Sequence, residues 1–101
     1  MSTIFLERRL RAVNRRLAQV RADLSVAEEQ LLHFTDESDD ARLRSLVSET
    51  PLAGVEHREA DRHSAAMARH RGELVELVSR LEAEQDMLLD KMTARRRPST
   101  L

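Results

Sequence analysis

The chain has 101 residues, of which 35% are charged and 2% are aromatic, and its formal net charge at pH 7 is −1. This length allows one domain, the near-neutral charge excludes a global electrostatic attraction to nucleic acid, and the absence of Cys excludes disulfides, thiolate metal sites and cysteine nucleophiles. Because Gly and Pro are scarce and only two Phe are present, the composition favours long helices that bury a thin seam over a thick globular core.

The first predicted element is a helix over residues 3–34. Its apolar residues recur at alternating steps of four and three: Leu6, Leu10, Val13, Leu17, Val20, Leu24, Ala27 and Leu31. This heptad pattern, with apolar a and d positions, is typical of a coiled coil. Ser2 or Thr3 is suited to cap the start of the helix.

A break in the helix is predicted at residues 35–38. The next large apolar residues, Leu43, Leu46 and Val47, fall out of phase with the preceding heptads. The intervening segment is rich in capping residues and carries acids where a new first turn favours them. We therefore expect a short second helix over residues 39–48.

The last predicted element is a long helix from Pro51 to about residue 94, after a turn near residue 49. Thr50 suits the N-cap and Pro51 suits the first helical position. The seam of this helix again follows steps of four and three: Ala60, Ser64, Met67, Arg71, Leu74, Val78, Leu81, Gln85, Leu88 and Met92. Residues 95–101 are predicted to be a disordered basic tail outside a hairpin domain of residues 1–94.

The two seams fit each other in an antiparallel hairpin. If facing residues have numbers that add up to 98, large apolar residues meet in these pairs: Leu6 with Met92, Leu10 with Leu88, Leu17 with Leu81, Val20 with Val78, Leu24 with Leu74, Leu31 with Met67, Leu43 with Val55, and Leu46 with Leu52. The midpoint of this pairing is residue 49, the position of the turn that the capping residues predict. The fold class is therefore all-α, a long antiparallel coiled-coil helical hairpin.

The apolar surface near the chain ends is wider than one seam needs. Residues assigned to this surface are Ile4, Phe5, Leu74, Val75, Leu77 and Leu89. A second hairpin typically buries such surplus width, so we expect a homodimer with four helices. The alternatives are scattered exposed side chains, which proteins tolerate, or a surface that receives a different protein.

The acidic segment Asp36-Glu37-Ser38-Asp39-Asp40-Ala41 contains the pattern D-x-x-D-x-A. This pattern resembles the fingertip of DksA/TraR-type transcription factors, whose coiled-coil finger enters the secondary channel of RNA polymerase. The resemblance implies that Asp36, Glu37, Asp39 and Asp40 bind RNA polymerase and that the protein regulates transcription. The chain departs from that family because it has no Cys for a zinc finger and because these acids precede the predicted turn. Gre-type cleavage factors share the finger, but their globular half has no counterpart here.

Two further candidate sites involve His and Arg residues. Glu29 with His33, and Glu59 with His63, have the spacing of metal ligands on neighbouring helices, but their heptad phases predict that the four side chains do not converge. Arg95, Arg96 and Arg97 in the basic tail are suited to weak, salt-sensitive contact with nucleic acid.

No Gly-rich phosphate loop, nucleophile elbow or cofactor motif occurs in the sequence. No apolar run is long enough for a membrane span. The sequence therefore predicts a cytoplasmic, non-catalytic coiled-coil interaction or adaptor protein without a cofactor, which self-associates and binds a protein partner. Binding of RNA polymerase is the first alternative, and nucleic-acid contact through the tail is the second.

Overall fold

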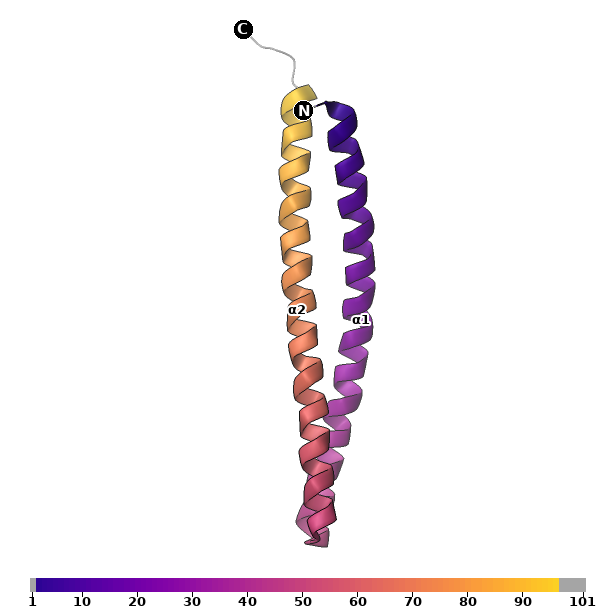
Figure 1. The fold of residues 1–101 in the computed structure, drawn as a ribbon, viewed down its shortest axis with the longest axis vertical. Coiled ribbons are helices and arrows are strands. Elements are labelled where there is room, and N and C mark those ends of the chain that lie inside the picture. The colour runs from indigo at the N-terminus through magenta and orange to yellow at the C-terminus, as the bar shows by residue number, and fades with distance from the viewer. Residues whose placement is uncertain (1, 97–101) are drawn as a thin grey trace.

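The computed structural model describes residues 2–96, which form two antiparallel helices joined at residues 49–50 (Figure 1). Helix α1 spans Thr3–Ser48 and helix α2 spans Pro51–Arg96. The rod measures 80 × 22 × 15 Å. The start of α1 and the end of α2 lie side by side at one end, which we call the base, and the connection forms the opposite end, which we call the tip. The predicted antiparallel helical hairpin is confirmed.

Local capping interactions define the ends of the helices. The Ser2 hydroxyl accepts a hydrogen bond of 3.2 Å from the Phe5 amide, and the Thr50 hydroxyl accepts one of 3.2 Å from the Ala53 amide. Glu49 ends α1 in the left-handed region, with φ 52° and ψ 26°. This conformation reverses the chain and frees Pro51 to start α2, so the predicted caps and turn are confirmed.

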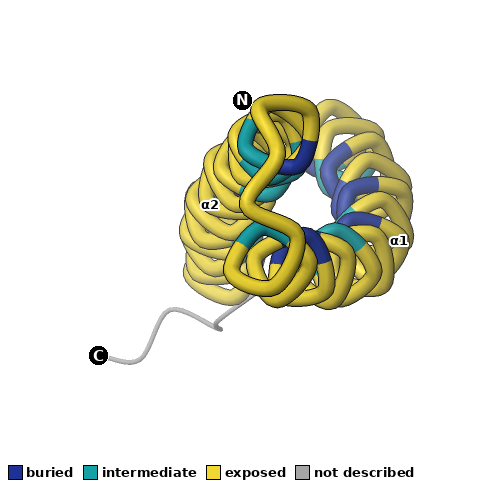
Figure 2. Tube along the Cα trace, turned by 90° about the horizontal axis from the view of Figure 1, so that it is seen from below, coloured by how far each residue is buried: buried dark blue, intermediate teal, exposed yellow. Residues whose placement is uncertain are grey.

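Large aliphatic side chains fill the seam in the base half of the rod. Leu6, Leu17 and Leu88 are almost completely buried, and Figure 2 shows the buried positions lining the side of each helix that faces the other. The register agrees with the predicted pairing, because the Gln85 side-chain amide donates a hydrogen bond of 2.8 Å to Asn14 Oδ1 across the seam. Burial of each such leucine contributes about 1.5–3 kcal/mol.

The predicted break at residues 35–38 is wrong, because α1 continues through it without interruption. The heptad also continues, but through smaller residues: Phe34, Ser38, Ala41 and Ser45 follow Leu31 at steps of three and four. Ser38 and Ala41 are buried, and the Ser38 hydroxyl donates a hydrogen bond to the Asp61 carboxylate on α2. A continuous helix keeps the backbone hydrogen bonds that a break would expose.

The predicted contacts between Leu43 and Val55 and between Leu46 and Leu52 are wrong for the same reason. These four side chains lie outside the seam and are exposed, from 39% for Val55 to 68% for Leu46. The prediction followed the largest apolar residues, whereas the phase set by the preceding heptads determines which side chains face the other helix.

The boundary of the predicted tail also changes. Helix α2 reaches Arg96, so Arg95 and Arg96 belong to its last turn. Residues 97–101, including Arg97, lie outside the described part of the chain.

We predict that the tip half opens more readily than the base half. Its seam consists mainly of Ala, Ser and His side chains, whereas Leu, Val and Met fill the base half. Less apolar surface buried per turn lowers the free energy of local opening. Amide hydrogen exchange should be at least about tenfold faster in the seam of residues 38–60 than in the seam of residues 6–24. This ratio corresponds to a difference of ~1.4 kcal/mol in the free energy of local opening. Equal protection along α1 would contradict this prediction.

Candidate functional site

The residues predicted to form a self-association surface serve different roles in the structure. Leu74 is buried in the seam, and Leu77 is half-buried against the same core. Both therefore stabilise the hairpin itself. Val75, Leu89 and the N-terminal pair of residues 4–5 are exposed, so only these members are free to contact another chain.

These exposed members do not form one patch. Val75 and Leu89 each follow a seam residue directly and lie on one flank of α2, whereas Leu77 precedes a seam residue and lies on the opposite flank. Ile4 and Phe5 lie on the side of α1 that points away from α2. Fourteen residues separate Val75 from Leu89, which corresponds to about 21 Å along the helix.

A different apolar surface emerges on α1. Every large hydrophobic residue of α1 that is clearly exposed lies on the side opposite the seam, at heptad positions b, c or f: Ile4, Phe5, Val26, Leu32, Leu43, Leu46 and Val47. We call this side the outer face of α1. The exposed Ala12, Ala18 and Ala22 lie on it as well. A helix with apolar residues on two opposite sides is suited to pack against a neighbour on each side.

Sequence reasoning missed this face because it searched for surplus apolar residues near the chain ends only. The signal was present in the sequence. Once Leu6 to Leu31 fix the seam phase, Val26 and Leu32 fall on the opposite side together with residues 43, 46 and 47.

Apolar side chains also surround the tip. Leu46 and Val47 end α1, and Leu52 and Val55 begin α2. Val47 is 84% exposed and Leu52 is 66% exposed. The tip therefore presents exposed aliphatic side chains around Glu49, whereas the fingertip of a DksA/TraR-type factor carries paired acids.

The acids of the D-x-x-D-x-A pattern lie within α1 and not at the tip. Asp36, Glu37, Asp39 and Asp40 are all exposed. Glu37 forms an ion pair of 3.2 Å with His33 one turn earlier. The sequence predicts these acids at a break in the helix. This placement is wrong, because they lie on the surface of the uninterrupted helix α1.

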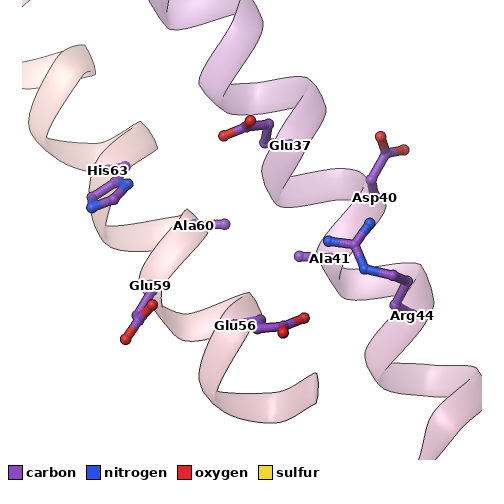
Figure 3. A pocket seen from close by; sticks show the side chains of 8 residues that line it. All are labelled: Glu37, Asp40, Ala41, Arg44, Glu56, Glu59, Ala60 and His63. Carbon is purple, nitrogen blue, oxygen red and sulfur yellow. The ribbon is translucent and has the colours of Figure 1, made fainter. Parts of the chain in front are cut away.

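A shallow groove of about 400 Å³ lies between the helices near these acids (Figure 3). Ala41 and Ala60 point toward each other across it, and their small side chains leave the space open. The rim carries these charged and polar residues: Glu37, Asp40, Arg44, Glu56, Glu59 and His63. Figure 3 shows Asp40 directed away from α2, so this carboxylate belongs to the outer face of α1.

The His residues make local contacts in the hairpin. His63 packs edge-on against Phe34, with ring centroids 5.8 Å apart, and His57 lies 3.3 Å from the Asp61 carboxylate. Within residues 2–96, no group of three or more His, Asp or Glu side chains is placed to hold a metal ion. Neither helix, over the described residues, contains a segment apolar enough to cross a bilayer.

Cross-helix ion pairs form in the base half of the rod. Arg9 lies 2.9 Å from Glu84, and Arg21 lies 3.3 Å from Glu82. Because all four side chains are partly or largely exposed, each pair contributes at most about 1 kcal/mol and mainly favours the antiparallel orientation.

Comparison with known protein families, with curated proteins and with solved structures found no match to this chain.

We predict that a charge introduced on α2 lowers the stability of the hairpin strongly in the seam and only slightly beside it. Leu74→Glu places a carboxylate in the buried seam and should destabilise the hairpin by about 3 kcal/mol or more. Val75→Glu and Leu89→Glu place the same group on exposed positions and should change stability by less than about 1 kcal/mol. Thermal and urea unfolding followed by circular dichroism measures the difference. A similar loss in all three variants would contradict the observed seam phase.

Proposed function

We propose that this protein is a non-catalytic coiled-coil interaction protein that self-associates and binds a protein partner. The outer face of α1 is the observation that carries the proposal. It presents large apolar side chains from Phe5 near the base to Val47 at the tip, all at least half exposed. Covering these side chains removes apolar surface from water, and this burial stabilises a complex by about 25 cal/mol per Å² of apolar surface.

The shape of the hairpin supports a role in assembly. Each helix of 46 residues extends about 69 Å, so base and tip present separate surfaces at a fixed distance. A rigid rod of this kind is suited to hold two binding partners apart, or to join copies of itself side by side.

The tip is the surface we assign to a protein partner. Leu52 and Val55 are exposed on the first turns of α2, beyond the outer face of α1. Exposed aliphatic residues at the end of a rod, next to charged residues such as Glu56 and Arg58, have the apolar centre and polar rim of a protein-binding patch.

Binding of RNA polymerase through the acidic segment has less support. Asp36 and Asp40 lie two to three turns before the end of α1, and the tip itself presents exposed aliphatic side chains around Glu49. The arrangement therefore differs from a finger that delivers acids at its apex.

We predict that the purified chain has twice the 11.6 kDa mass of one copy in multi-angle light scattering at tens of micromolar. Phe5→Glu combined with Leu46→Glu should produce a monomer of unchanged helical content, because charges then occupy both ends of the outer face of α1. Val75→Glu combined with Met87→Glu is the matched control. These residues are similarly exposed but lie on α2, and the dimer should persist. A parent protein that is monomeric at this concentration would overturn the proposed self-association.

A further inference from the structure

We infer that a second copy of this chain lies antiparallel along the outer face of α1, so that the base half of each α1 covers the tip half of the other. This inference rests on the proposed self-association and specifies its surface and its orientation.

The outer face of α1 carries opposite charges at its two ends. Arg8, Arg11 and Arg15 lie on it toward the base, and Asp36, Asp39 and Asp40 lie on it toward the tip, all at heptad positions b, c or f. Within residues 2–96, Arg11 lies 3.7 Å from Glu7. The other five side chains make no ion pair or hydrogen bond in that part of the chain.

This charge pattern selects the antiparallel orientation. Two parallel copies of α1 would place arginines against arginines and aspartates against aspartates. Two antiparallel copies that overlap over their full length place Arg15 beside Asp36 and Arg11 beside Asp40 of the second copy. The two-fold axis then crosses between Ser25 and Val26, the middle of α1, and each contact occurs twice. Exposed ion pairs of this kind determine orientation more than affinity.

The same overlap covers the apolar ends. Ile4 meets Val47 of the second copy, and Phe5 meets Leu46. Between these ends, Leu32 meets Gln19 of the second copy and lies next to Ala18, whose small side chain permits close approach of the two helices. One symmetric contact thus buries both apolar ends of α1 and leaves Leu52 and its α2 neighbours accessible to a different protein.

The available area is sufficient for a stable dimer. A strip about 10 Å wide along a helix of about 69 Å gives about 700 Å² per copy and about 1,400 Å² in total. Specific protein interfaces bury about 1,200–2,000 Å². The two α1 helices would form the centre of a four-helix arrangement, with the two α2 helices outside.

Distances between spin labels test the orientation directly, since the chain contains no Cys and a single introduced cysteine labels one position per copy. In the antiparallel dimer, labels at Ala12→Cys lie about 40 Å apart, because 27 residues separate position 12 from its counterpart at position 39. Labels at Ser25→Cys, next to the two-fold axis, lie within about 20 Å, since one helix diameter is about 10–12 Å. Both measurements are made on samples whose dimeric mass is checked by light scattering.

Each outcome of the distance measurement is decisive. A long Ala12 distance with a short Ser25 distance supports the inference. A short Ala12 distance would show a parallel dimer, and long distances at both positions would place the interface away from the outer face of α1. Either result overturns the antiparallel arrangement while leaving self-association intact, whereas a monomeric parent protein removes both.

Charge reversal with rescue tests the residues themselves. Arg11→Glu with Arg15→Glu should weaken the dimer at least tenfold at low salt, because four attractive contacts per dimer become repulsive. Adding Asp36→Arg and Asp40→Arg to the same chain should restore the affinity to within about threefold of the parent, since the charges are again complementary. A quadruple variant that dimerises no better than the double variant would refute the proposed pairing.

A matched control is available on α2. Arg58 and Arg62 are exposed and have the same spacing and the same b and f heptad positions as the arginines of the test pair. Arg58→Glu with Arg62→Glu introduces the same charge change on the helix that lies outside the proposed interface. The dimer affinity should stay within about threefold of the parent, and a loss equal to that of the test pair would show that net charge, and not position, controls association.

Discussion

The leucine seam of the base half is the interaction on which the rest of the structure depends. Leu6, Leu17 and Leu88 are almost completely buried, and their interlocking determines which side of each helix faces the other. Once that phase is established, every other side chain has a determined direction. The seam therefore also decides which apolar residues stay in contact with water, and it indirectly creates the outer face of α1.

The tip half shows that a coiled coil tolerates small residues in its seam and leucines outside it when the preceding heptads already determine its phase. Small residues such as Ser38, Ala41 and Ala60 continue the seam, although they bury little apolar area. Leu43 and Leu46 are larger and lie in the same segment. Turning either of them into the seam would require a change in the heptad phase of α1 and a break in its helical hydrogen bonds. The chain keeps its helix and leaves these leucines exposed, so the tip presents aliphatic side chains to solvent.

The proposed antiparallel dimer gives one physical account of features that otherwise appear unrelated. Arginines such as Arg15 at the base, aspartates such as Asp36 toward the tip, and exposed apolar residues at both ends all lie on one helical side. In this arrangement the acidic segment is half of a complementary surface, and its likeness to a polymerase-binding fingertip reflects a short pattern of similar residues in a different structural position.

The sequence by itself determined the helical segments 3–34 and 51–94, the turn near residue 49, the caps at Ser2 and Thr50, and the register of the base half. These features follow from local hydrogen bonding and from a heptad repeat that uses large residues, both of which are visible in one chain. Only the tertiary structure showed that residues 35–48 continue α1 and that the leucines of this segment lie outside the seam. There the local signals, capping residues and out-of-phase leucines, favour a break. The helix instead stays continuous, because it keeps its backbone hydrogen bonds and its seam phase against α2, and those leucines then point outward.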